Sequence, residues 1–154
     1  MSDQGRYGHA CDGRSGAARR HLQLTVPACG LPVRLARQVT CEVLTDWGLA
    51  HVEETAVLLV SELVTNAVRH ATCTDAITLE LEVARTWLRI EAYRCRPGLA
   101  APRTTAEFDE SGYEFALVDS LADRWGVRET VTGKTAWAEL DVGDEPGPKG
   151  ALIS

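Results

Sequence analysis

The sequence predicts a single α+β domain, a two-layer sandwich in which helices cover one face of a mostly antiparallel sheet. Three observations support this prediction. Two adjacent segments alternate apolar and polar residues, as half-buried strands do, and they meet at a short turn. Two earlier segments repeat apolar residues at the helical period. A second alternating pair follows a short helical segment, so the predicted order is β-α-α-β-β-loop-α-β-β.

Each element has its own local signal. The first strand is expected over 21–26, where HLQLTV alternates before Pro27. A helix is expected over 32–47, with Gly48 placed to end it. The other expected elements are a helix over 51–71, strands over 76–84, 87–92, 125–131 and 134–142, and a short helix over 114–122. The unpatterned, proline-containing stretch 95–112 is expected to be a functional loop.

Composition narrows the class of protein. The chain has 154 residues, of which 45% are apolar, enough for one core. A net charge of −6 argues against a nucleic-acid partner, and no run of apolar residues is long enough to span a membrane. The first residues lack the apolar segment of a signal peptide, so a cytoplasmic location is expected. In that compartment, five cysteines with no C-x-x-C spacing predict free thiols.

The stretch 58–71, LLVSELVTNAVRHA, carries polar groups within a largely apolar helix. A helical wheel at about 100° per residue predicts one apolar arc. Its members are Val57, Val60, Leu63, Val64, Ala67, Val68 and Ala71. The opposite side is predicted to hold Glu62, Thr65, Asn66, Arg69 and His70. A solvated polar face explains such a stripe, but an Asn inside a helix has poor helix propensity and is unusual there.

Three segments carry a resemblance to a known family. SELVTNAVRHA (61–71) resembles the N-box of the Bergerat-fold ATPases, the group of gyrase, Hsp90 and the histidine kinases. LVDSLADRWGV (117–127) and GKTAWAEL (133–140) resemble the closing segments of small actinobacterial anti-sigma-factor serine kinases. The resemblance implies a histidine kinase-like ATPase domain over 20–142, between a disordered arm (1–19) and a flexible tail (143–154).

The resemblance also implies cofactors and site residues. Asn66 matches the residue that supplies a side-chain oxygen to the Mg²⁺ bound to ATP, and Mg²⁺ prefers oxygen ligands. Glu62 matches the catalytic acidic residue that orients or deprotonates an attacking hydroxyl. The other matching positions are nucleotide contacts: Arg69 and His70 toward the phosphates, Gly112 at a phosphate-binding turn and Thr135 beside adenine. For Arg69 and His70, a surface role is an equal alternative.

Two positions depart from the family pattern. Arg94 falls where the family has an Asp that accepts a hydrogen bond from the adenine amino group, and Arg has donors only. Glu114 replaces the second glycine of a phosphate-binding box that begins at Gly112. The Glu114 carboxylate is expected to occupy the place of the ATP phosphates. Two negative unit charges 4 Å apart repel by roughly 4 kcal/mol at an effective dielectric of about 20, so even part of this repulsion would weaken phosphate binding.

The function expected from this pattern is regulatory. The first reading is an anti-sigma-factor serine/threonine kinase with impaired nucleotide binding, whose partner is a sigma factor or an anti-sigma antagonist. The alternative is a non-catalytic partner-binding module on the same fold. A third reading is an ATPase-like piece that serves a separate receptor or DNA-binding regulator. Whether the chain is an enzyme stays open, and the resemblance also allows a homodimer.

Overall fold

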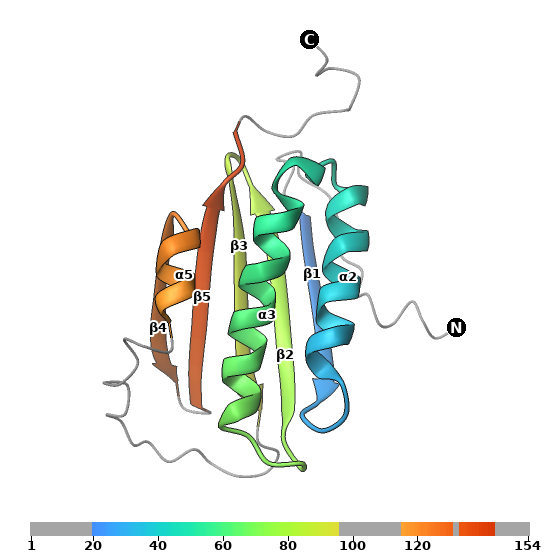
Figure 1. Cartoon of the computed structure of the whole chain (residues 1–154), viewed down its shortest axis with the longest axis vertical. Coiled ribbons are helices and arrows are strands. Elements are labelled where there is room, and N and C mark those ends of the chain that lie inside the picture. The colour runs from blue at the N-terminus through green and yellow to red at the C-terminus, as the bar shows by residue number, and fades with distance from the viewer. Residues whose placement is uncertain (1–19, 96–114, 131–132, 144–154) are drawn as a thin grey trace.

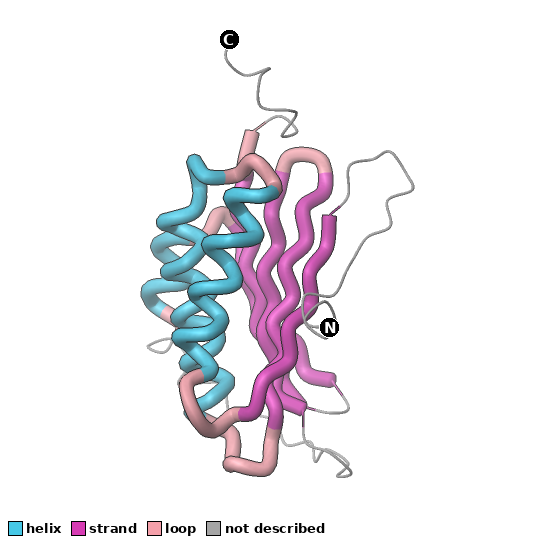
Figure 2. Tube along the Cα trace, turned by 90° about the vertical axis from the view of Figure 1, so that its right-hand side faces the viewer, coloured by secondary structure: helices cyan, strands magenta, loops and turns pink. Residues whose placement is uncertain are grey.

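Five strands form one antiparallel sheet, and the helices lie on one face of it (Figures 1 and 2). The computed structural model describes residues 20–95, 115–130 and 133–143. The strand order is β1-β2-β3-β5-β4, and each neighbouring pair is antiparallel. The strands are β1 (Arg20–Pro27), β2 (Ala76–Ala84), β3 (Trp87–Cys95), β4 (Arg124–Thr130) and β5 (Gly133–Asp141). The predicted α+β two-layer sandwich is therefore confirmed.

Helix α3 (Glu53–Arg69) crosses the centre of the sheet, mainly over β3. Helix α2 (Pro32–Asp46) packs beside it, and the short α5 (Ala116–Leu121) packs against α3 and β4. Proline stands at the start of α2, where its missing N–H costs nothing. The 3-10 turn η1 (Ala50–Val52) leads directly into α3, so the helix predicted from residue 51 begins as a tighter turn.

The core lies between the two layers. Alternate residues of the three strands β1, β2 and β3 point toward the helices and are almost fully buried. These are Leu22, Leu24 and Val26 on β1, Ile77, Leu79, Leu81 and Val83 on β2, and Leu88, Ile90 and Ala92 on β3. This regular alternation determines the face of the sheet on which each remaining strand residue lies, including the residues near the predicted site.

The opposite face of the sheet is open and polar. Arg89 bridges two carboxylates there, Glu91 at 2.8 Å and Glu139 at 2.6 Å, and its guanidinium lies 4.3 Å from the centre of the Trp137 ring. Arg124 adds a second contact to Glu139 at 2.8 Å. An antiparallel sheet tolerates one such solvated face, because only the other face has to build the core.

The orientation of α3 differs from the predicted wheel. Its buried residues are Ala56, Leu59, Val60, Leu63, Val64 and Asn66. The prediction placed Asn66 opposite the core, but this residue is only 9% exposed. It lies about 60° around the helix from Leu63 at 100° per residue, at the edge of the buried arc. The predicted polar stripe is therefore wrong at Asn66, because α3 is covered by the sheet and by neighbouring helices over a wider arc than a simple amphipathic face.

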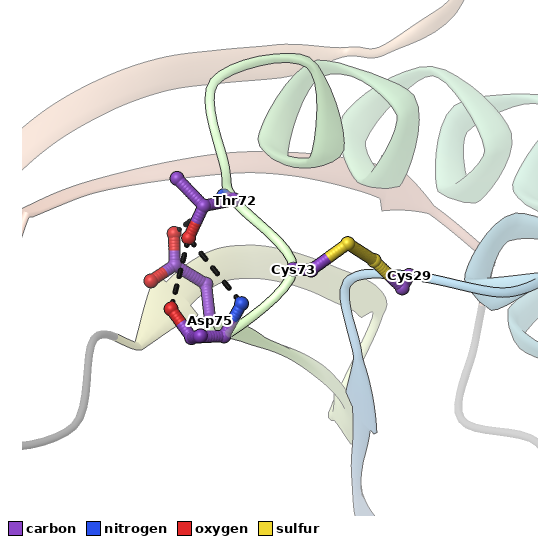
Figure 3. The surroundings of a disulfide bond; sticks show 5 residues. Cys29, Thr72, Cys73 and Asp75 are labelled. Carbon is purple, nitrogen blue, oxygen red and sulfur yellow. Dashed lines mark hydrogen bonds between the residues drawn. A yellow bond between two sulfur atoms is a disulfide. The ribbon is translucent and has the colours of Figure 1, made fainter.

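The expectation of free thiols is wrong for two cysteines. Cys29 and Cys73 form a disulfide whose Cα atoms are 5.0 Å apart (Figure 3). Strand pairing explains the meeting. The register ends at Pro27 opposite Ala76, and one further hydrogen bond from the Ala28 N–H to the Asp75 carbonyl keeps the two flanking loops side by side. Cys41 and Cys95 are free as predicted, and Cys11 lies outside the described residues.

Several predictions fall partly or wholly outside the described residues. They concern the arm over 1–19, the loop over 95–112 and the tail over 143–154. Within the part of the chain that the structure describes, no helix is both long and apolar enough to cross a membrane. The helix predicted over 114–122 is described only from Ala116 to Leu121.

Candidate functional site

Asn66 is the central residue of the candidate site. It lies one turn before the end of α3 and is 9% exposed. Among the residues that the structure describes, none forms a hydrogen bond with its side-chain amide. Among the described residues, the fully enclosed side-chain polar atoms without a partner include Oγ of Ser61 but not the Asn66 amide, which therefore stays accessible to water or a ligand. The position therefore suits an amide oxygen held ready for a ligand, and oxygen is the ligand that Mg²⁺ prefers.

Glu62 lies one turn before Asn66 on the same side of α3. The two residues are about 40° apart around the helix at 100° per residue. Glu62 is half-buried. The structure thus brings together the predicted catalytic residue and the predicted metal ligand, as their i,i+4 spacing requires.

Arg69 and His70 follow at the carboxyl end of α3, and both are exposed. The backbone carbonyl of His70 accepts a hydrogen bond from Nη1 of Arg94. A cation at this end of a helix is favourable, since the unpaired carbonyl groups carry partial negative charge. Arg94 therefore ties the end of β3 to the end of α3.

Arg94 faces the helix layer. Its register partner on β2 is Ile77, a core residue, and directly opposed residues of an antiparallel pair point to the same face. The family's adenine-binding Asp was predicted to fall on Arg94, and this position does face the side on which α3 lies. A guanidinium has five donors and no acceptor, so Arg94 does not fit recognition of the adenine amino group.

Thr135 lies on the other face of the sheet. Its register partner on β3 is Tyr93, which points away from the helices, and β5 shows no interruption of the ladder here. Thr135 is 4% exposed. The structure therefore does not bring Thr135 together with Asn66, and an adenine contact from this side chain does not fit the register.

Sequence reasoning missed Lys134 as a candidate. Strand alternation places its side chain on the same face as Ala136 and Ala138, toward the helices. The neighbouring Gly133 lies close to Arg94, since a Cβ added there would be 3.8 Å from Nη2. The alternation was visible in the sequence, but the motif match drew attention to Thr135 instead.

The remaining predicted residues lie elsewhere. Gly112 and Glu114 are outside the described residues, so their predicted contacts stay predictions. Within residues 20–95, 115–130 and 133–143, no three His, Cys, Asp or Glu side chains are grouped to hold a metal ion. Any Mg²⁺ here would depend on Asn66 together with ligand oxygens and water, which is how Mg²⁺ is commonly held beside phosphates.

Comparison with known proteins agrees with this architecture. The sequence model of the histidine kinase-like ATPase domain matches residues 28–140, and the chain belongs to this family. A similar solved structure is that of the RsbU and RsbW domains of Rv1364c from Mycobacterium tuberculosis, with 20% sequence identity and a TM-score of 0.56. The match covers 79% of this chain and 32% of that one, so this chain spans about a third of that protein. Among curated proteins, none matches this sequence.

Proposed function

We propose that this protein is a regulatory ATP-binding protein of the anti-sigma-factor kinase type, in which Arg94 weakens nucleotide binding. The proposal rests first on Asn66, a residue 9% exposed on the helix that carries the N-box resemblance. Its i−4 neighbour Glu62 is proposed to orient or deprotonate the attacking hydroxyl of a protein substrate. The proposed location is the cytoplasm, where ATP is available.

When bound, Mg²⁺-ATP would supply the transferable phosphoryl group, and Asn66 would help to hold the Mg²⁺. The residues around the end of α3 are basic: Arg69 is exposed, and Arg94 and Lys134 lie on the helix-facing side of the sheet. Such cations favour a polyanion. They do not replace the missing acceptor for adenine, so phosphate attraction is proposed to persist while base recognition is weakened.

The proposed partner is a sigma factor or an anti-sigma antagonist. Two facts support this partner class: the sequence resemblance to anti-sigma-factor kinases and the fold match to a protein that contains an RsbW domain. A homodimer is a further part of the proposal, which the resemblance to the family allows.

Calorimetric titration with Mg²⁺-ATP tests the role of Arg94. Arg94→Asp supplies the carboxylate acceptor, and a hydrogen bond to a charged group contributes about 1.5–3 kcal/mol. We therefore expect Arg94→Asp to bind at least about tenfold more tightly than the natural chain. Arg34→Asp, with the same charge change on α2, is the matched control and should not improve binding. A folded Arg94→Asp variant with no heat up to several millimolar nucleotide would contradict the proposal.

That negative result would favour a second function, a non-catalytic partner-binding module. One observation supports it: the Arg94 guanidinium bonds to the carbonyl of His70 and so joins two elements that flank the nucleotide position. A module of this kind would keep its partner affinity in both Asn66→Ala and Glu62→Gln. Isolating the partner with the natural chain and repeating the binding with these variants separates the two functions.

A further inference from the structure

The Cys29–Cys73 disulfide lies on the surface, at the end of the molecule where α3 stops (Figures 1 and 3). Cys29 is in the loop between β1 and α2, and Cys73 is in the turn between α3 and β2. Both residues are exposed, and neither belongs to the hydrophobic core cluster. A thiolate can therefore reach the bond without any opening of the core, which is the access that thiol–disulfide exchange requires.

Hydrogen bonds close the same turn without the disulfide. The Thr72 N–H donates to Oδ2 of Asp75 at 2.8 Å, and the Asp75 N–H donates to the Thr72 carbonyl at 2.9 Å. The Ala28 N–H donates to the Asp75 carbonyl at 3.0 Å, which extends the β1–β2 ladder by one step. Asp75 itself is 2% exposed, although Thr72 is exposed. Cleavage of the disulfide is therefore expected to leave the sheet folded.

The Cys29–Cys73 bond links the two segments that form the walls of a groove. An open groove of about 660 Å³ is lined by Ala28, Gly30 and Leu31 on the Cys29 side and by Val68 of α3 on the other. Between Val68 and Cys73 the chain passes through exposed Arg69 and His70. Without the disulfide, the turn after α3 is held to the Cys29 loop by the Ala28–Asp75 hydrogen bond, and α3 stays packed on α2. The segment 69–73 is then the part that gains freedom.

We propose that Cys29–Cys73 is a reversible redox site through which a dithiol reductant loosens the carboxyl end of α3. A thiolate of the reductant attacks one of the two sulfurs, forms a mixed disulfide and releases the other cysteine as a thiolate. The second reductant thiolate then attacks the mixed disulfide and frees the remaining cysteine. Two electrons pass to the protein, which gains two thiols after protonation, and the reductant becomes a disulfide. Oxidised glutathione carries out the reverse exchange.

Hydrogen exchange with mass spectrometry on the full chain tests this site without any nucleotide. We expect dithiothreitol to speed amide exchange over residues 69–75 by about tenfold or more, with β2 and β3 unchanged, because local opening becomes easier. Alkylation of the folded, reduced protein should label Cys29 and Cys73, and oxidised glutathione should restore the slow exchange.

Two variants complete the test. The double variant Cys29→Ser, Cys73→Ser should show the fast exchange and no response to dithiothreitol. Cys41→Ser, which keeps the bond, should behave like the natural chain. The inference is overturned if dithiothreitol leaves exchange over 69–75 unchanged, if it unfolds the whole sheet, or if both cysteines are already alkylated in the oxidised protein. None of these outcomes depends on ATP. The redox site can therefore be confirmed or overturned whether or not the protein binds nucleotide.

Discussion

Glu139 on β5 joins two arginines on the open face of the sheet. It accepts hydrogen bonds from Nε of Arg124 at 2.8 Å and from Nη1 of Arg89 at 2.6 Å. Partial burial alone would raise the pKa of the Glu139 carboxyl. The hydrogen bonds from the two arginines outweigh this effect and hold the pKa below its usual value. The folded protein therefore holds the ionised form more firmly than the unfolded chain does.

This lowered pKa predicts a pH dependence of stability. A group whose pKa is lowered by folding stabilises the protein above its unfolded pKa, about 4.3 for Glu, and loses this contribution as pH falls through the folded pKa. Urea unfolding should show a clear loss of stability in Glu139→Gln at pH 7 and a smaller difference from the natural chain at pH 3. An equal difference at both pH values would show that the carboxylate charge is not responsible.

Asn66 and Arg94 are the two residues on which the functional account depends. The resemblance to the family's N-box and to its adenine-binding strand identified both positions. It did not reveal that Asn66 is buried or that Arg94 bonds to the carbonyl of His70, since both facts depend on how α3 sits over β3.

The rotation of α3 about its axis is a property of the element and can be tested. Leu59 is fully buried, although the predicted apolar arc left it out, whereas its neighbour Leu58 is 43% exposed. Leu59→Ala should lower the free energy of unfolding by about 2–5 kcal/mol, because it leaves a cavity in the core. Leu58→Ala is the matched control and should cost roughly 0.5 kcal/mol or less. Equal losses in urea unfolding would contradict this orientation.

The β4–β5 pair has one position that accepts only glycine without rearrangement. Gly126 lies directly opposite Trp137, and a Cβ there would be 2.9 Å from the indole ring. The ring cannot move freely, since the guanidinium of Arg89 stacks over it at 4.3 Å. Gly126→Ala should therefore destabilise the protein by about 1–3 kcal/mol, as overpacking does.

A double-mutant cycle checks this explanation for Gly126. In a Trp137→Val background the contact is absent, so Gly126→Ala should cost clearly less in thermal or urea unfolding. If the cost is the same in both backgrounds, contact with the indole ring is not its cause.

The elements themselves were largely predictable from the sequence, whereas their contacts were not. Alternation identified β2 with its exact bounds and most of β3, because each strand has one face in the core. The same alternation places Thr135 on the open face, yet the motif resemblance suggested an adenine contact there. The Cys29–Cys73 bond was missed for another reason. Spacing alone does not pair cysteines 44 residues apart, and the pairing follows only once β1 is known to lie beside β2.

At the scale of the whole molecule, the candidate site and the disulfide share one end of the fold. The carboxyl ends of α3 and β3 and the first residues of β2 and β5 meet there (Figure 1). Arg94 joins β3 to α3, and Cys73 joins the segment after α3 to the start of α2. The opposite end of the molecule carries short turns, such as the one at Arg85, which has a φ of 51°. The candidate site and the proposed redox site therefore lie at the same end.

The most direct test of the central claim is a nuclear magnetic resonance titration with Mn²⁺-ADP, whose unpaired electrons broaden nearby resonances. The account predicts that the side-chain amide of Asn66 broadens first, while Thr135 and Arg89 on the open face do not. Mn²⁺ without nucleotide is the control, and it should not select Asn66. Broadening centred on the open face, or an unchanged Asn66 signal at millimolar Mn²⁺-ADP, would contradict a nucleotide-metal site beside this residue.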